Sequence, residues 1–162
     1  MRIETLVERL REHAALRADR VALRFIEGDD VAEELTFAAL DRRIRALAAV
    51  LQEHAGEGER AVLLLPNGPD YAVAFYACLY AGVIAVPAYP PETGKERYTS
   101  RLDGILRDAS PRLILTQTRL RDSIAASLGR TVAHIVAVDA LPLDAAASAG
   151  AGLEGAPVEP VL

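Results

Sequence analysis

The sequence predicts an α/β fold: an open, mostly parallel sheet with helices on both faces, and a small edge hairpin near the N-terminus. Two observations carry this prediction. Short apolar runs alternate with segments of helical periodicity over residues 61–138, as in a parallel sheet built from crossover units. Residues 60–91 read RAVLLLPNGPDYAVAFYACLYAGVIAVPAYPP, which predicts a strand, a helix and a second strand joined by tight turns.

This crossover unit is the centre of the predicted fold. Residues 61–65 form an apolar run typical of a strand buried on both faces. Pro69 suits the first position of the next helix, and Gly82 suits the left-handed position just past its end. We expect Pro87 to end a second strand over residues 83–86. The helix between them is apolar around nearly its whole circumference and should be buried, with a repeat formed by Tyr71, Ala72, Phe75, Tyr76 and Leu79.

Periodicity and turn residues place the other elements. Thr36 is expected to cap a helix over residues 37–54, although Ala39 stands where a Glu would complete the capping box. The first helix, over residues 3–16, should carry its apolar stripe on Ile3, Leu6, Val7 and Leu10. The remaining predictions are a hairpin from strands 21–26 and 34–36, a loop at 88–97, helices at 98–109 and 119–128, and strands at 113–116 and 134–138.

Composition and charge exclude several classes of protein. The net charge is −5 and the arginines are spread among acidic residues, unlike the basic face of a nucleic-acid-binding protein. No apolar run approaches the roughly 20 residues needed to span a bilayer, and the acidic N-terminus does not resemble a signal peptide. With Cys78 as the only cysteine, we expect a reducing, cytoplasmic location.

The chain length fits one domain with a core of its own. We expect residues 1–138 to form that folded unit. Residues 139–162 contain no basic residue and no large apolar periodicity, which predicts a linker or a disordered tail.

Three glycine-containing segments resemble nucleotide-binding motifs only in their spelling. Residues 150–155 match GxGxxG, but no strand precedes them, and Ala156-Pro157 follows where a helix should begin. Residues 56–61 come before their strand rather than after it. Gly94-Lys95 resembles the end of a P-loop, but Glu96 replaces the Ser or Thr that would bind magnesium. A flexible linker and solvated loops are the better interpretations.

No residue of this chain is assigned a catalytic, cofactor-binding or metal-binding role. Cys78 lies among apolar residues that should raise its pKa and leave it an inert core thiol. The histidines have no nearby carboxylate or cysteine cluster, and the serines lack the GxSxG turn that exposes a nucleophile. These residues are His13, His54 and His134, and Ser100, Ser110, Ser123 and Ser127.

Aromatic and proline residues gather where a ligand would bind. In an open parallel sheet, ligands bind beyond the carboxyl ends of the strands. That edge should consist of residues 66–68, 87–97 and 117–118. Alternatively, the prolines stiffen a loop and the tyrosines bridge core and solvent. The residues concerned are Tyr76, Tyr80, Tyr89, Pro90 and Pro91.

Three segments together resemble the amino-terminal part of the adenylate-forming superfamily. They are ELTFAALDRRIRALAAVLQ, then ERAVLLLPNGPDYAVAFYACLYAGVIAVPAYPP, then RLDGILRDASPRLILT. The VPAYPP string and its spacing to PRLILT look most like the fatty acyl-AMP ligases, and the resemblance covers residues 5–138.

The resemblance implies an enzyme that activates a fatty acid with ATP and Mg²⁺ to an acyl-adenylate, and then passes the acyl group to the phosphopantetheine arm of a carrier protein. The family's Ser/Thr/Gly-rich phosphate loop, its aromatic-Thr-Gly-Asp motif and its catalytic lysine do not occur in this sequence. We therefore expect the chain to be the first subdomain of such a ligase, inactive alone. Faces that would pack on the remainder of the ligase should favour self-association.

Two other functions are compatible with parts of the sequence. A non-catalytic module that docks onto a synthase would also explain the self-contained alternation of strands and helices. A flavodoxin-like nucleotide-binding domain rests on analogy of fold alone.

Overall fold

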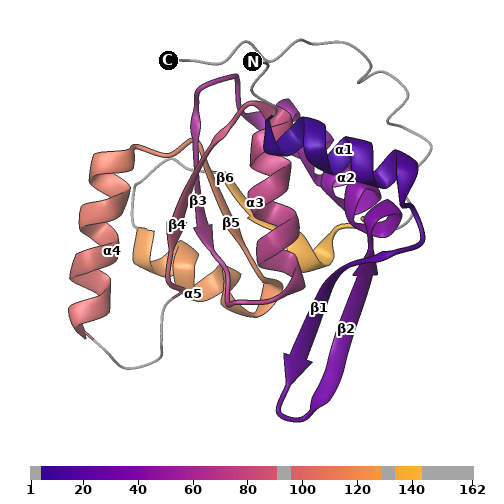
Figure 1. The fold of residues 1–162 in the computed structure, drawn as a ribbon. Helices are drawn as coiled ribbons and strands as arrows, with labels where there is room; N and C mark the ends of the chain where they lie inside the picture. The colour runs from indigo at the N-terminus through magenta and orange to yellow at the C-terminus, as the bar shows by residue number, and fades with distance from the viewer. Residues whose placement is uncertain (1–4, 91–95, 129–133, 144–162) are drawn as a thin grey trace.

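The computed structural model describes residues 5–90, 96–128 and 134–143, arranged as helices around a parallel sheet (Figure 1). The helices are α1 (Leu6–Leu16), α2 (Phe37–His54), α3 (Pro69–Ala81), α4 (Glu96–Ala109) and α5 (Thr118–Leu128), followed by the short 3₁₀ helix η1 (Val138–Ala140). The strands are β1 (Val21–Glu27), β2 (Asp30–Thr36), β3 (Arg60–Leu64), β4 (Ile84–Ala88), β5 (Leu113–Thr116) and β6 (His134–Ala137).

The main sheet has four strands in the order β4-β3-β5-β6, and every pair of neighbours is parallel. The predicted crossover unit is confirmed, since β3 pairs with β4 from Arg60 opposite Ile84 to Leu64 opposite Ala88. The chain then crosses back over β3 to reach β5 and β6. The predicted α/β class is therefore correct.

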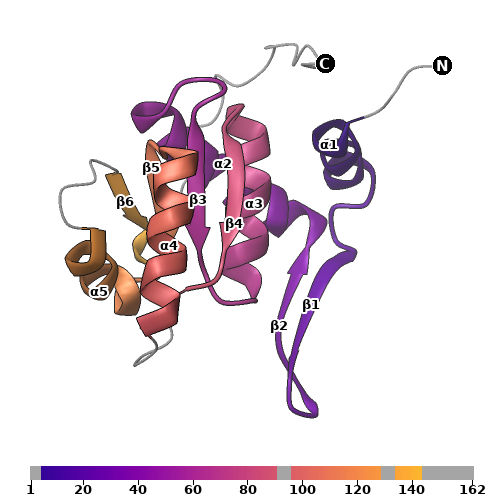
Figure 2. The ribbon, with the colours of Figure 1, turned by 90° about the vertical axis from the view of Figure 1, so that its left-hand side faces the viewer.

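Helices cover both faces of this sheet (Figure 2). Alternate side chains of β3 enter two different cores, because successive side chains of a strand point to opposite faces of the sheet. Leu63 joins a core formed with α1, α2 and α3, whereas Leu64 joins a second core with α4 and α5. All of Ala61 to Leu65 is buried, which confirms the strand predicted to be enclosed on both faces.

Helix α3 begins and ends as the sequence predicts. Pro69 occupies its first turn, and Gly82 ends it in the left-handed conformation with φ 72°. The most buried side chains are Val73, Ala74, Ala77 and Cys78. The apolar repeat from Tyr71 to Leu79, which was expected to be buried, is only half-buried. The smaller residues of α3 form the face toward α2 and the sheet.

Strand β4 is longer than predicted. Pro87 lies inside the strand opposite Leu63, and does not end it. Proline removes one hydrogen-bond donor, and an edge strand tolerates this loss on its unpaired side. Because β4 is at the edge of the four-stranded sheet, Pro87 is compatible with the ladder. Ala88 also belongs to β4, and Glu96 already begins α4, so the predicted loop at 88–97 is shorter.

The N-terminal helix has a cap that the sequence analysis missed. Thr5 and Glu8 form a capping box, in which the Glu8 amide donates to Thr5 Oγ1 and the Thr5 amide donates to Glu8 Oε2. Ile3, where we expected the helix to begin, lies outside the described residues. Leu6 is 59% exposed, so its assignment to the apolar stripe was wrong, whereas Val7 and Leu10 are buried as expected.

The hairpin is a separate two-stranded sheet that extends away from the helices (Figure 1). Its second strand starts at Asp30, earlier than predicted, because a two-residue turn at Gly28-Asp29 pairs Glu27 with Asp30. The predicted cap of α2 is present, since the Ala39 amide donates to Thr36 Oγ1 at 3.2 Å. Ala39 packs against the first core, which explains why a Glu is not found there.

Ordered structure continues past the predicted boundary at residue 138. Asp139 lies in η1, and Leu141 and Leu143 pack against the first core. The rest of the segment predicted to be a linker or a disordered tail, residues 144–162, lies outside the described residues. Its nature stays a prediction.

Candidate functional site

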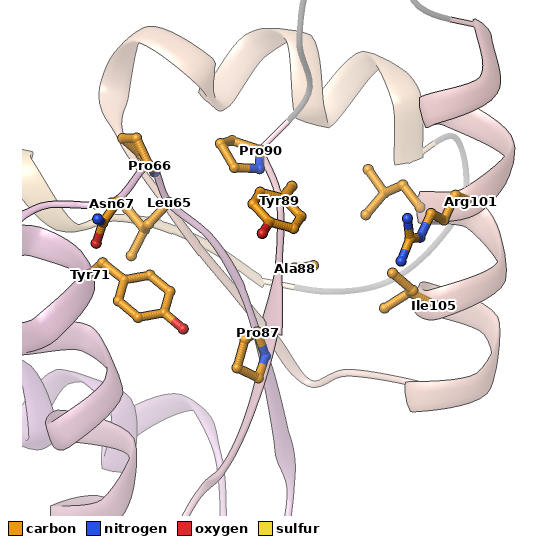
Figure 3. A pocket seen from close by; sticks show the side chains of 11 residues that line it. Leu65, Pro66, Asn67, Tyr71, Pro87, Ala88, Tyr89, Pro90, Arg101 and Ile105 are labelled. Atoms are coloured by element: carbon orange, nitrogen blue, oxygen red, sulfur yellow. The ribbon is translucent and has the colours of Figure 1, made fainter.

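A cavity of about 910 Å³ lies at the carboxyl end of β4 (Figure 3). Its wall consists of residues that follow β3, residues at the end of β4, and side chains of α3 and α4. We call it the β4 pocket. It is lined by Leu65, Pro66, Asn67, Tyr71, Pro87, Ala88, Tyr89, Pro90, Arg101, Leu102 and Ile105.

The topology explains why a pocket forms at this place. The connection leaving β3 enters α3 on one face of the sheet, whereas the connection leaving β4 enters α4 on the other face. Ligands of open α/β sheets bind beyond the carboxyl ends of the strands, and the pocket lies at that edge, beside the ends of β3 and β4. The expectation that residues after β3 and β4 form this edge is confirmed by Pro66, Asn67, Tyr89 and Pro90, whereas Pro87 lines the pocket from within β4.

The pocket extends across the end of β4. Figure 3 shows Tyr71 on the α3 side of the strand, with its ring toward Pro87. Arg101 reaches from α4 toward Tyr89 on the other side, close to Ile105. Arg101 is the only charged side chain among the described residues of the lining, and the rest is mostly apolar or aromatic. Such a lining fits an apolar ligand that carries one negative charge.

Side-chain hydrogen bonds link the residues at the rest of the carboxyl edge. Gln117, after β5, donates from Nε2 to Asp70 Oδ2 at 2.8 Å and accepts from Arg119 Nε at 3.1 Å. The Thr118 amide and hydroxyl both donate to Asp139 Oδ1, at 2.7 and 2.9 Å, which ties the start of α5 to η1. Gln117 and Thr118 thus lie at the predicted edge, but neither lines the pocket.

The prediction that Tyr76 and Tyr80 join Tyr89 at the ligand edge was wrong. Because α3 leaves the carboxyl end of β3 and returns to the start of β4, its last turn lies at the amino end of the sheet. Tyr80 is buried there, and its hydroxyl donates to Asp41 Oδ1 of α2 at 2.7 Å. The tyrosine of α3 that lines the pocket is Tyr71, in the first turns of the helix. Pro91 lies outside the described residues.

Two of the three histidines lie side by side although they are distant in the sequence. The rings of His54 and His134 stack with centroids 4.1 Å apart, and His13 lies against Phe37 at 5.0 Å. Burial, the neighbouring His54, and the Arg121 and Arg112 charges lower the pKa of His134. Within the described residues, no three His, Cys, Asp or Glu side chains come together as a metal site would require.

Cys78 is a core thiol, as predicted. It is fully buried, and this burial raises its pKa to about 12, far from the range of a reactive thiolate. Ser110, just after α4, and Ser123, within α5, donate from their hydroxyls to the backbone carbonyls of Arg107 and Leu120. The side chains of Ser100 and Ser127, the Gly94-Lys95 pair and residues 150–155 lie outside the described part of the chain.

Sequence reasoning missed the contribution of α4 to the pocket. Arg101 and Ile105 are one helical turn apart, so they share a face of α4. This spacing was visible in the sequence. It became informative only once α4 was known to lie beside the end of β4.

Comparison with known proteins identifies the family. The model of the AMP-binding enzyme family matches residues 10–160, which is nearly the whole chain. This chain belongs to the AMP-binding enzyme family. The adenylate-forming resemblance stated from the sequence is thereby confirmed.

Curated members of the family that resemble the chain are fatty-acid ligases. FadD32 of Mycolicibacterium smegmatis, a long-chain-fatty-acid–AMP ligase, is 36% identical over 152 residues, which cover 89% of this chain and 24% of that protein. FadD25 of Mycobacterium tuberculosis, named provisionally as a fatty-acid–CoA ligase, is 37% identical over 87% of this chain and 25% of its own length. The chain thus spans about a quarter of the length of the curated relatives it matches.

Solved structures of the family share this fold. A fatty acyl-adenylate ligase of L. pneumophila, solved with acyl adenylate and pyrophosphate, matches with a TM-score of 0.75 and 30% identity, over 88% of this chain and 25% of that one. The fatty acid AMP ligase of Legionella pneumophila matches with a TM-score of 0.76 and 29% identity. The fold is that of the amino-terminal subdomain of adenylate-forming enzymes.

The described residues do not fit a magnesium site or a triphosphate site. Magnesium prefers carboxylate oxygens, but Asp70 and Asp139 at the carboxyl edge are each held by a side chain or a helix start. Among the residues that the structure describes, the lining of the β4 pocket contributes one cation, Arg101, where several charges would meet a triphosphate. No described helix is long and apolar enough to cross a membrane.

Proposed function

We propose that this chain forms the amino-terminal subdomain of a fatty acyl-AMP ligase, which activates a fatty acid with ATP to give an acyl-adenylate. One observation carries the proposal. The chain aligns at 30% identity, over 88% of its length, with a ligase solved with acyl adenylate and pyrophosphate. Those two molecules are the products of that activation step.

The further course of the reaction is proposed from the family resemblance. The acyl group would pass from the adenylate to the phosphopantetheine arm of a carrier protein, in lipid, polyketide or lipopeptide synthesis. Magnesium would accompany ATP and offset the negative charge that develops during attack on the α-phosphorus. The groups that hold the metal and the phosphates would belong to the remainder of the ligase.

We propose that the chain alone does not form an adenylate. The proposal is supported by the described residues, which give the lining of the β4 pocket one cation and which include no metal-binding cluster. In this view the chain supplies a rigid scaffold and one wall of a binding site. The remaining length of the ligase supplies the reactive groups.

ATP–pyrophosphate exchange tests both proposals. We expect exchange that depends on dodecanoate in a protein of the relatives' length that carries this chain at its N-terminus, and none with the 162-residue chain alone. Exchange by the 162-residue chain would contradict the scaffold role. Absence of exchange in the longer protein across fatty acids of several lengths would contradict ligase activity.

A further inference from the structure

We propose that the amino edge of the main sheet binds a tetrahedral dianion, the form of a phosphate group, at His54, Arg112 and His134, and that the two histidines take up a proton when it binds. This site lies at the edge of the sheet opposite the β4 pocket and shares none of its lining. It goes beyond the proposed ligase function and does not depend on it.

The topology brings these residues together from distant parts of the chain. Helix α2 ends at His54, Arg112 directly precedes β5, and His134 begins β6. The His134 amide donates to the Arg112 carbonyl at 3.0 Å, so the two residues are neighbours where their parallel strands begin. Arg112 Nε donates to the His54 carbonyl at 3.2 Å, which holds the guanidinium beside the end of α2. The rings of the two histidines stack on each other.

The charges around the histidine pair are positive. After partial burial, the charges of His54, of Arg121 in α5 and of Arg112 all lower the pKa of His134. Among the described residues, no carboxylate contributes to this effect. Two guanidinium groups repel a metal cation and attract an anion. A bound anion would offset the charges that oppose protonation of His134. We call His54, Arg112, Arg121 and His134 the histidine cluster.

The donors of the histidine cluster are accessible to an ion from solution. Arg112, Arg121 and His134 are exposed, and none of the ion pairs described in the structure includes them. In the described contacts Arg112 donates through its Nε, so its terminal N–H groups can meet two oxygens of one anion. A protonated imidazole donates from both nitrogens. A tetrahedral dianion has enough oxygens to accept from both kinds of group.

Anion binding and protonation should strengthen each other. An anion that pairs with the protonated imidazole raises the pKa of His134, and by linkage it binds more tightly as the pH falls through about 6.5. Because the groups are exposed, we expect the affinity to increase by about three- to fivefold between pH 7.5 and pH 5.5.

NMR of the imidazole resonances in the 162-residue chain tests the site. Sulfate is the probe, because it keeps two negative charges throughout this pH range, and sodium chloride of equal ionic strength is the reference. We expect saturable shifts of the His54 and His134 signals, and weaker binding of acetate, which carries one charge. His13 lies against Phe37, away from the cluster, and its signal should not respond.

Three variants separate charge from structure. His134→Gln should remove most of the pH dependence of sulfate binding. Arg121→Gln should weaken sulfate binding by about threefold. Unlike a substitution of Arg112, it leaves the hydrogen bond to His54 in place. Arg42→Gln is the matched control, because Arg42 is an exposed arginine of α2 that lies about 18 Å from His54 along the helix.

Three results would overturn the proposal. The first is an equal response of the His54 and His134 signals to sulfate and to chloride. The second is equal sulfate affinity in the Arg121→Gln and Arg42→Gln variants. The third is saturable binding of Zn²⁺ at His54 and His134 that displaces sulfate, which would indicate a metal site instead.

Discussion

The hydroxyl of Tyr80, near the end of α3, donates a 2.7 Å hydrogen bond to Oδ1 of Asp41 in α2. The other oxygen of the same carboxylate accepts from Arg45 Nε at 2.6 Å. The guanidinium of Arg11 in α1 lies over the tyrosine ring, 4.7 Å from its centroid. Three helices therefore meet at one buried phenol, on the face of the sheet opposite α4 and α5.

Replacing Tyr80 by Phe should destabilise the fold by about 1 kcal/mol, the usual net contribution of one hydrogen bond. The ring would keep its packing, while Asp41 would retain only the Arg45 contact. Urea unfolding followed by circular dichroism measures the difference. Tyr76→Phe, at a half-buried tyrosine of the same helix with no described hydrogen bond from its hydroxyl, is the control and should change stability less. Equal losses in both variants would contradict the role given to the Asp41 contact.

The same tyrosine should make the fold sensitive to alkali. Burial first, and then the bond to Asp41, raise the pKa of Tyr80 above its ordinary value of about 10. The folded state therefore holds the proton of the Tyr80 hydroxyl more tightly than the unfolded state does. The stability that the protonated hydroxyl contributes is lost as the pH rises above about 10. Unfolding midpoints at pH 8 and pH 11 should differ less in Tyr80→Phe than in the unchanged chain. An identical alkaline loss in both would contradict this prediction.

Cys78 should be unreactive until the protein unfolds. Its burial raises the pKa to about 12, so almost no thiolate is present at neutral pH. We expect labelling by a thiol reagent such as DTNB to be at least about a hundredfold slower in buffer than in urea. Because Cys78 is the only cysteine, the signal reports a single site. Rapid labelling of the folded chain would show that α3 is less well packed than described.

His134 should weaken the fold in mild acid. Partial burial, His54, and the Arg121 and Arg112 charges lower the pKa of His134 below its ordinary value near 6.5. The unfolded chain therefore takes up this proton more readily, and stability falls as the pH decreases from about 6.5. His134→Gln should reduce the difference in urea midpoint between pH 7.5 and pH 5.5. An unchanged difference would show that other groups control the acid response.

Gly82→Ala should destabilise the fold by about 1–2 kcal/mol, because a non-glycine residue is strained in the left-handed conformation. Gly82 has φ 72°, and an added Cβ would lie 3.2 Å from Glu57 Cγ. Gly104→Ala is the matched control. Nothing lies within 4 Å of its added Cβ inside α4, and alanine should stabilise that helix by about 0.5–1 kcal/mol. Thermal unfolding of both variants gives the comparison, and shifts of the same sign would refute it.

Local chemistry accounts for what the sequence predicted well. Pro69, Gly82 and Thr36 act within one turn of their own helices, so each boundary could be assigned from a few neighbouring residues. The alternation in β3 between two cores likewise follows from the strand period alone.

The errors concern relations between distant segments. Pro87 was expected to end a strand because its edge position became known only with the order of strands. Tyr80 was placed at the wrong end of the sheet, although the direction of a crossover helix is enough to place it at the amino end. Arg101 was missed because the pocket depends on how α4 sits beside β4.

Pro87 also limits what can attach to this molecule. A strand of another polypeptide that paired with β4 on its outer side would lack one hydrogen-bond donor, because Pro87, opposite Leu63, has no amide hydrogen. Propagation of β-structure from one copy to the next is thereby discouraged along the outer strand, a protection that natural proteins often build from proline. Pro87, which lines the β4 pocket, should therefore also disfavour fibrous assembly of the chain along β4.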